Sequence, residues 1–433
     1  MTFADAWRPN GIKILKRFID KPLFLHQSPA EAPRRAAAAG SGAANLARQT
    51  SPVRRTDQSK NREETMRKSV VTALSVLLAF SSSALAQPKQ VLFGALLPLT
   101  GPAAPIGIEE QQGVQFAVDQ INARGGIRGV PVKILFDDSQ GKPDQAVLAF
   151  NRMIDLEKVP ALLTAFSSIS LAIAPLATRR QVLVVNPAAQ TDKLENASPF
   201  LINTLPMVRQ EAGVLAKYAI KNIGKTAAII YENAAAGIDG STDFRKYFEE
   251  AGGKIIAEEP VEFGQTNYRS TLLKIAAAKP DFVYIAITQS HDAMANQVGQ
   301  IPGFPTGIGN TFSRPFFGHA STEGWYQTAI QSGYPDNATV AAFKKQFNAE
   351  DMGFFAREYF NATNIVLKAA EKVLADGGEI TGPALRDAVL KIRTFDSPVA
   401  KINFESNTAS RPVEILRYKG KERVMVETAQ SAN

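Results

Sequence analysis

From Gln87 onward, short apolar runs alternate with longer segments in which apolar residues recur every three or four positions. The first run, VLFGALLPL, is followed by a Gly/Pro turn and by a segment in which Val114, Ala117 and Ile121 recur at helical spacing. Two successive blocks of this kind cover most of the sequence. Strands that alternate with helices are typical of a parallel sheet covered on both faces. The pattern therefore predicts an α/β protein with two Rossmann-like lobes.

The order of the predicted elements suggests how the two lobes are connected. Strands are expected in VLFGALLPL, VPVKILFDD, PALLTAF, VLVVNP, TAAIIYEN, KIIAEEPVEF, DFVYIAIT and the strand-like PFFGHA. Two long helical patterns and TGPALRDAVLK follow, and the last segment alternates as strands with a hairpin turn at Lys419-Gly420. Helices that arrive after both sheets must pack against one of them. We therefore expect a multi-strand hinge, with residues 87–205 and 335–398 in the first lobe and 206–334 and 399–433 in the second.

The segment before Gln87 reads as an export signal with an extension in front of it. Met66–Ala86 combines a basic start, the apolar run Val70–Phe80 and a small-residue ending, which are the three parts of a cleaved signal peptide. The apolar run is shorter than the roughly 20 residues that span a bilayer. Residues 1–65 are rich in Ala, Arg, Ser and Pro, so we expect either a disordered extension or a start codon assigned too early.

Charge and cysteine content narrow the compartment and the partners. The formal net charge of +8 arises entirely before Gln87, because basic and acidic residues balance in the rest of the chain. A neutral main domain gives no support for a nucleic-acid partner. The chain has no cysteine, which excludes disulfides, a thiol-linked lipid anchor and thiolate zinc sites. We expect a monomer in the periplasm.

Three serines interrupt the apolar run LLTAFSSISLAIAP at a predicted strand-to-helix junction. A hydroxyl at this place can cap the helix, act as a nucleophile or help to hold an anion. Helix capping requires only one of the three. The start of a helix also favours an anion, because its free N–H groups and its dipole point toward the ligand.

Catalytic chemistry is poorly represented in the main domain. His291 and His319 are its only histidines, and no Gly-x-Ser-x-Gly motif surrounds the serines. The glycine-rich NARGGIRG follows a helix and precedes a strand, which is the wrong order for a phosphate-binding loop. The acidic pair Asp137-Asp138 is isolated from other metal ligands. We therefore expect no enzyme activity, no metal and no cofactor, and a binding function remains.

Several stretches occur together in an order that is specific to one family. They are ALLPLTGPAAPIG, QQGVQFAVDQINARGGIRGVPVKILFDDSQGKPDQAV, AFSSISLAIAPLA, VLVVNPAAQT and AAKPDFVYIA. With them the chain resembles the leucine/isoleucine/valine-binding family of periplasmic receptors for ABC importers, from Val91 to about Val426. The resemblance implies the type I periplasmic binding protein fold, in which two lobes close over a ligand between the carboxyl ends of their sheets.

The resemblance also indicates where the ligand would lie. In that family the hydroxyl-bearing turn after the third strand holds the ligand carboxylate, and Ser167 and Ser168 match it here. The positions that match the family's ligand-binding turns, residue by residue, are Ile106, Ser167, Ser168, Ala188, Gln190, Ala236, Thr288 and His319.

The match departs from an amino-acid site at several of these positions. Ile106 and Ala236 stand where the family often has aromatic residues, and the GHAS stretch lacks the acid that pairs with a ligand ammonium. A pocket without these groups is larger and leaves an ammonium unpaired, which is costly. The departures favour a bulkier aromatic or hydrophobic acid. Glu232, Asp239 or Asp292 could restore an acidic partner, so an amino acid stays open as the alternative.

The resemblance implies an extracytoplasmic solute receptor that closes over a small hydrophobic carboxylate and presents it to ABC transporter permease subunits. The ligand would be a branched-chain or other amino acid, or an aromatic or hydrophobic acid. The alternative from another class is a ligand-sensing periplasmic protein that feeds a signalling receptor.

Overall fold

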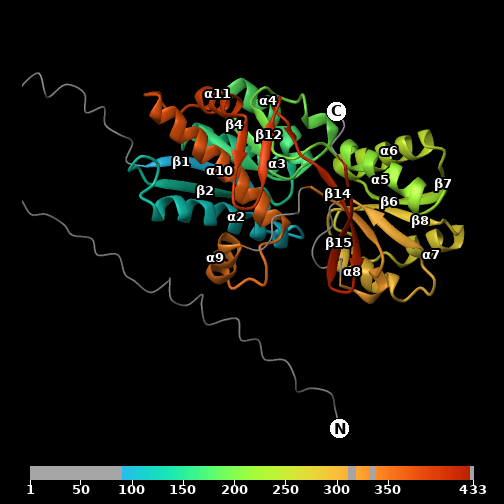
Figure 1. The fold of residues 1–433 in the computed structure, drawn as a ribbon. Coiled ribbons are helices and arrows are strands. Elements are labelled where there is room, and N and C mark those ends of the chain that lie inside the picture. The colour runs from blue at the N-terminus through green and yellow to red at the C-terminus, as the bar shows by residue number, and fades with distance from the viewer. Residues whose placement is uncertain (1–89, 311–317, 331–336, 430–433) are drawn as a thin grey trace, which may run out of the picture. The chain divides into compact units, whose positions relative to one another are not determined.

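A five-stranded parallel sheet forms the centre of the first lobe (Figure 1). The computed structural model describes residues 90–310, 318–330 and 337–429, so the extension 1–65 and the signal 66–86 lie outside the described part. The strand order is β2-β1-β3-β4-β5. Its strands are β1 (Val91–Leu97), β2 (Val132–Asp138), β3 (Ala161–Thr164), β4 (Leu183–Asn186) and β5 (Leu201–Asn203).

A seven-stranded sheet forms the centre of the second lobe, in the order β15-β14-β10-β9-β8-β6-β7. Its parallel strands are β6 (Thr226–Glu232), β7 (Lys254–Val261), β8 (Phe282–Ala286), β9 (Thr306–Gly309) and β10 (Tyr326–Ile330). The antiparallel pair β14 (Val413–Lys419) and β15 (Glu422–Ala429) completes it. The two sheets confirm the predicted α/β fold with two Rossmann-like lobes.

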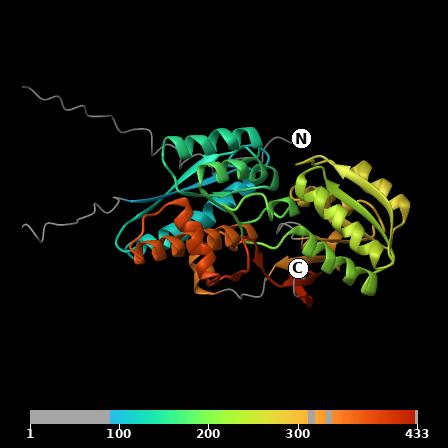
Figure 2. The ribbon, with the colours of Figure 1, turned by 90° about the horizontal axis from the view of Figure 1, so that it is seen from above.

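Alternation along the strands explains why helices cover both faces of the first sheet. Leu163 of β3 packs in one apolar cluster, and its neighbour Leu162 packs in another on the opposite face. The first cluster contains α2 (Ala104–Ala123), α9 (Ala338–Phe347), α10 (Phe354–Ala375) and α11 (Gly382–Ile392). The second contains α3 (Pro143–Asp155) and α4 (Ser167–Arg180). Figure 2 shows the late helices, coloured orange, on one side of this sheet.

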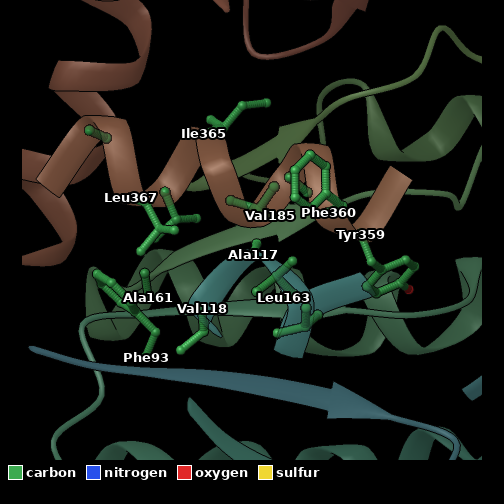
Figure 3. Packing of buried hydrophobic residues seen from close by; sticks show 14 of the residues in the cluster. Phe93, Ala117, Val118, Ala161, Leu163, Val185, Tyr359, Phe360, Ile365 and Leu367 are labelled. Atoms are coloured by element: carbon green, nitrogen blue, oxygen red, sulfur yellow. The ribbon is translucent and has the colours of Figure 1, made fainter. Parts of the chain in front are cut away.

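Close packing fixes the late helix α10 against the first sheet. Phe360 and Leu367 of α10 lie in the same buried cluster as Phe93 and Leu163 from the strands (Figure 3). The second sheet is covered in the same way, by α5 (Val208–Asn222) and α6 (Ala235–Glu250) on one face and α7 (Arg269–Ala278) and α8 (His291–Val298) on the other. The return of α9 to α11 to the first lobe agrees with the sequence-based expectation.

The chain differs from the predicted lobe boundary near its end. A small antiparallel sheet, β11 (Thr394–Asp396), β12 (Lys401–Phe404) and β13 (Ala409–Ser410), packs Ile402 and Phe404 into the first lobe's cluster. Residues 399–410 therefore lie in the first lobe, and the chain enters the second sheet only at β14. The alternating pattern of β12 predicts a strand correctly, but it does not say which core receives the apolar face.

Short elements account for the other differences from the predicted pattern. β5, β9, β10, β11 and α8 were not predicted from the sequence, because each is too short to show a clear periodicity. The strand-like PFFGHA lies partly outside the described residues, and a 3-10 turn, η4 (Ala320–Thr322), follows it. Lys419 pairs with Glu422, so the hairpin turns at Gly420-Lys421, one residue later than expected.

Arg411 joins the segments where the chain crosses between the lobes. These crossings follow β5, β10 and β13. Arg411, on the last crossing, is buried and pairs with Glu358 of α10 at 2.7 and 3.1 Å. It also makes long hydrogen bonds to the carbonyl oxygens of Thr204 and Ile330, which lie at the other two crossings. A single buried guanidinium thus ties the three hinge segments together.

Candidate functional site

A cavity of about 420 Å³ lies where strands of both sheets end. Its volume falls within the usual range of small-molecule sites, about 300–1,000 Å³. Parallel strands place the residues that follow them at one edge of their sheet, so loops of both lobes meet at this place. The lining residues are Glu110, Gly141, Pro143, Phe166, Ser167, Ser168, Ala188, Ala189, Gln190, Val208, Glu232, Asn233, Ala234, Ala235, Ala236, Gly237, Phe263, Ile285, Ala286, Ile287, Thr288, His291, Asn310, Phe354 and Phe355.

The structure brings most of the sequence-predicted site residues to this cavity. Those that line it are Ser167, Ser168, Ala188, Gln190, Ala236 and Thr288. Ile106 and His319 are not among the lining residues. Ile106 lies in the first turn of α2, which begins at Ala104, and the cavity contact of this helix is Glu110. His319 precedes η4, and its Nε2 lies 2.9 Å from the Asp292 carboxylate.

The serine stretch opens α4 directly at the cavity. Phe166 is the N-cap residue, and no side chain caps this end of the helix. The Ser167 hydroxyl accepts a long hydrogen bond from the Thr191 backbone N–H at 3.4 Å, and Ser168 is exposed. Ser170 is buried, and its hydroxyl lies 3.4 Å from that of Thr164. Ser167 and Ser168 therefore face the cavity without acting as helix caps, whereas Ser170 belongs to the interior.

Four helices begin at the cavity, and a helix start can favour an anion. They are α4 at Ser167, α6 at Ala235, α8 at His291 and α10 at Phe354, and none of their N-cap residues makes a side-chain cap. In α10, the Glu109 carboxylate accepts a hydrogen bond from the Ala356 backbone N–H at 3.3 Å. Uncapped N–H groups and the helix dipole favour an anion at such ends. Among the described residues, none that lines the cavity is a Lys or Arg. An anion would therefore be held by hydroxyl and backbone donors.

Four phenylalanines line the cavity, none of them predicted from the sequence. Phe166 has a backbone φ of 60°, which is rare for a non-glycine residue and costs about 1–3 kcal/mol. Its ring meets that of Phe263 from the second lobe edge to face, with centroids 5.6 Å apart. Phe354 and Phe355 enter from the start of α10. The aromatic surface expected to be lost at Ile106 and Ala236 is thus supplied from other elements.

Glu232 is a buried acid on the second-lobe side of the cavity. Its Oε2 accepts from the backbone N–H of Thr288 at 3.2 Å and from the Thr288 hydroxyl at 2.5 Å. Its Oε1 accepts from Gly264 N–H at 3.4 Å. Burial raises the pKa of Glu232, and these hydrogen bonds oppose that rise. Glu232 thus holds the loops after β7 and β8 in place with both of its oxygens.

Glu110 is a second buried acid, on the first-lobe side. Only 1% of it is exposed, and its Oε2 has no hydrogen-bond partner within the described residues. Burial raises the pKa of Glu110 to about 8, with a smaller rise from neighbouring Glu109 and an opposing hydrogen bond from Tyr359. The carboxyl group is therefore mostly protonated at neutral pH. No sequence pattern marked it, because it lies nearly two turns inside α2 rather than after a strand.

Other polar groups of the site serve the fold. Burial lowers the pKa of His291 to about 4, so its imidazole is neutral and a weak base at neutral pH. The Gln190 amide donates to Glu211 at 2.6 Å and to the Pro206 carbonyl oxygen at 3.0 Å, so its N–H groups are used near the hinge. Over residues 90–310, 318–330 and 337–429, no group of His, Asp and Glu side chains could hold a metal ion. Within the same ranges no helix is long and apolar enough to cross a membrane.

Comparison with known proteins shows the family of the chain. A family profile described as periplasmic binding protein matches residues 90–423. A leucine-, isoleucine-, valine-, threonine- and alanine-binding protein from Pseudomonas aeruginosa is 26% identical over 354 residues, which cover 79% of this chain and 92% of the relative. The matched family and relatives are binding proteins and not enzymes.

Two solved structures share the fold at low sequence identity. A solute-binding protein of an ABC transporter from Rhodopseudomonas palustris, in complex with 3,4-dihydroxybenzoic acid, has a TM-score of 0.70 and 21% identity, with coverage of 80% of this chain and 99% of that one. The branched-chain amino acid receptor LivJ from Streptococcus pneumoniae, in complex with isoleucine, has a TM-score of 0.70 and 19% identity, with coverage of 79% and 99%.

Proposed function

Because the chain belongs to the periplasmic binding protein family, we propose that it binds a small hydrophobic carboxylate in this cavity and delivers it to an ABC importer. One observation carries the proposal. Ser167 and Ser168 open a helix without a side-chain N-cap in a cavity whose described lining contains four phenylalanines and no Lys or Arg. Such a cavity suits a ligand with one anionic end and an apolar body.

Each wall contributes differently to the proposed binding. The hydroxyls of Ser167 and Ser168 and the first N–H groups of α4 bind the carboxylate, and hydrogen bonds to a charged group contribute about 1.5–3 kcal/mol each. The rings of Phe166, Phe354 and Phe355 contact the apolar body. Ala188 and the carbonyl oxygen of Gln190 complete the first side, and Ala236 and Thr288 form the opposite one.

Delivery depends on contact of the ligand with both lobes. A ligand shifts the balance between lobe arrangements only by its difference in affinity for them. The cavity lining comes from both sheets, so a bound acid stabilises the arrangement in which the lobes meet. That arrangement is the form offered to the permease subunits. We place this monomeric receptor in the periplasm, exported through the signal peptide Met66–Ala86.

The relatives support two ligand classes for this cavity. The Pseudomonas relative is named for aliphatic amino acids, and the Rhodopseudomonas structure holds a hydroxylated benzoic acid. Both kinds of ligand combine a carboxylate with an apolar body. The four cavity phenylalanines suit an aromatic acid, and the acids Glu232 and Glu110 leave an amino acid open.

A thermal-shift screen against amino acids, aromatic acids and aliphatic acids tests the proposal. A ligand present at 100 times its Kd adds about 2.7 kcal/mol to the free energy of unfolding. We expect at least one small carboxylate to raise the Tm by several degrees. A protein that no carboxylate stabilises, but that a neutral solute or a cation does, would contradict the proposal.

A further inference from the structure

We infer that Glu110 is a specificity-determining residue that accepts a hydrogen bond from a donor group of the ligand. The inference rests on the proposed function, because it concerns the same cavity. It adds one requirement: the carboxylate ligand also carries a hydroxyl or ammonium group that reaches Glu110. Acids that lack such a donor would leave a buried oxygen of the protein without a partner.

Because Glu110 is buried, an oxygen of its carboxyl group without a hydrogen-bond partner is energetically costly. The residue is 1% exposed and lines the cavity, and its Oε2 has no hydrogen-bond partner in the described part of the chain. A buried polar atom without a partner is costly, and nearly all such atoms in folded proteins are paired. Almost none of the surface of this oxygen is accessible to water, so solvent supplies no partner either. The ligand itself must then supply the partner.

The neighbouring tyrosine shows that this oxygen is an acceptor. Tyr359 of α10 donates its hydroxyl proton to the Thr164 carbonyl oxygen at 2.8 Å, and a carbonyl oxygen can only accept. A hydroxyl has a single proton, so the neutral carboxyl group of Glu110 can bond to Tyr359 only by donating its own proton. The other carboxyl oxygen, Oε2, then carries no hydrogen. Burial, which raises the pKa of Glu110 to about 8, is consistent with this arrangement. In the ionised form the Tyr359 hydroxyl can donate to the carboxylate instead, which is why this contact lowers the pKa of Glu110.

The second buried acid of the cavity does not offer a free acceptor. Both oxygens of Glu232 accept hydrogen bonds from Thr288 and Gly264. The groups that act on Glu110 are Tyr359 from α10 and Glu109 on its own helix, and His291 and Glu232 line other parts of the cavity. In the described part of the chain, no lysine or arginine lines the cavity to compete for Oε2. Glu110 is therefore the acid that a ligand donor meets.

A hydroxyl donor and an ammonium donor of the ligand differ in the number of protons that binding should release. A ligand hydroxyl donates to Oε2 while Glu110 keeps its proton and its bond to Tyr359, so no proton is exchanged with solvent. A ligand ammonium favours the ionised carboxylate. At pH 7 its binding would therefore release up to one proton from Glu110 to the buffer, and the Tyr359 hydroxyl would be free to turn toward the carboxylate.

Isothermal titration calorimetry with two matched pairs of acids tests the inference. The pairs are leucine with 4-methylpentanoate, and 4-hydroxybenzoate with benzoate. In at least one pair we expect the donor-bearing acid to bind about ten- to a hundredfold more tightly, because its counterpart leaves Oε2 unpaired. Repeating the titrations in buffers of different ionisation enthalpy gives the number of protons released, which should approach one for leucine and be zero for 4-hydroxybenzoate.

Two variants separate a ligand contact from a structural role. In Glu110→Gln the amide N–H₂ can replace the carboxyl proton on Tyr359 while the amide oxygen still accepts, so hydroxyl recognition should survive within a few fold and ammonium recognition should fall about tenfold or more. Glu110→Leu should abolish the discrimination in both pairs. Glu109→Gln is the matched control, because Glu109 does not line the cavity and the amide oxygen can still accept from the Ala356 backbone N–H, so the discrimination between the members of each pair should persist.

The outcomes distinguish this inference from the function on which it rests. If acids bind but the donor-free member of each binding pair is as tight as its partner, the inference is wrong and the proposed function stands. The same conclusion follows if Glu110→Leu keeps the wild-type discrimination. If no carboxylate binds and none stabilises the protein, the proposed function fails and takes the inference with it.

Discussion

The two walls of the cavity differ in how their polar groups are used. The first-lobe wall carries Ser167 and Ser168 at an uncapped helix start and Glu110 with a free oxygen. The second-lobe wall contains the small residues 234–237, and its acid Glu232 is satisfied by neighbouring loops. The first wall thus offers two serine hydroxyls and an unpaired carboxyl oxygen, whereas the acid of the second wall is already hydrogen-bonded.

This difference assigns separate tasks to the lobes. Polar groups with spare capacity gain most from a ligand, so the first lobe should fix the position and orientation of the acid. The second lobe then covers it with an apolar surface, which excludes water and strengthens the hydrogen bonds beneath. We therefore expect the first lobe to determine which polar groups a ligand must carry. The second lobe should tolerate different shapes of the ligand's apolar body.

Removal of both serine hydroxyls from the first-lobe wall should have the largest effect on ligand binding. We expect Ser167→Ala plus Ser168→Ala to weaken carboxylate binding about a hundredfold or more, because each lost hydrogen bond to the anion costs about 1.5–3 kcal/mol. Ser170→Ala is the matched control, since that serine is buried beside Thr164. Calorimetric titration measures both. Equal losses in the double variant and the control would contradict the assignment.

A second prediction uses the pH dependence of stability to test the burial of Glu110. Its pKa is about 8 in the folded protein and near 4.5 when unfolded, so the folded state keeps a proton that the unfolded state has released between these values. Stability is therefore lost as the pH rises through this window, by up to about 1.4 kcal/mol per pH unit. Glu110→Gln cannot ionise and lacks this loss.

Urea unfolding of the wild type and Glu110→Gln at pH 5 and pH 8 measures this effect. The variant should gain stability relative to the wild type as the pH rises, and Glu109→Gln should not. A difference between variant and wild type that stays constant with pH would mean that Glu110 is ionised and solvated in the folded protein.

A larger side chain in the second-lobe wall should affect only how well the apolar body of a ligand fits. Ala236→Leu adds volume opposite the serines, and the resulting overlap costs about 1–3 kcal/mol for an acid whose body fills the cavity. We expect affinity for benzoates to fall about tenfold or more and affinity for a smaller acid such as alaninate to change less. Equal losses for large and small acids would show that Ala236 contacts the polar end.

The smallest effect on binding is expected for Thr288. Thr288→Val keeps the shape of the second wall but removes the hydroxyl that donates to Glu232. Stability should fall by about 1–3 kcal/mol, because a buried acceptor loses a donor, while ligand affinity should change less than about threefold. A loss of affinity as large as that of the serine variant would show that the second wall also binds the polar end.

Much of the fold follows from the sequence, for identifiable reasons. Alternating apolar strands and periodic helices gave both parallel sheets and the return of α9 to α11 to the first lobe. The stretch 399–410 was assigned to the second lobe, since the alternation in β12 shows that one face is buried but not against which core. The short elements β5, β9 and α8 carry too few residues for a periodic signal.

The sequence predicted site residues only where those residues directly follow a strand. Ser167, Ala188 and Thr288 lie just past strand ends, so the topology of parallel sheets nominated them. Glu110 and Phe354 lie in helices that reach the cavity through tertiary packing, which no local pattern reports. Phe166 could have been suspected from its position between a strand and the serines, but its left-handed backbone is visible only in the structure.

The central claim is that the first wall holds the carboxylate of the ligand, and the affinity of an acid relative to its primary amide tests it most directly. The amide keeps the shape of the acid and removes its charge. We predict that the wild type binds the tightest acid of the thermal-shift screen about a hundredfold more tightly than its amide, and that this ratio falls below about tenfold in Ser167→Ala plus Ser168→Ala. An amide that binds the wild type as tightly as the acid, or a ratio that the double substitution leaves unchanged, would contradict the account.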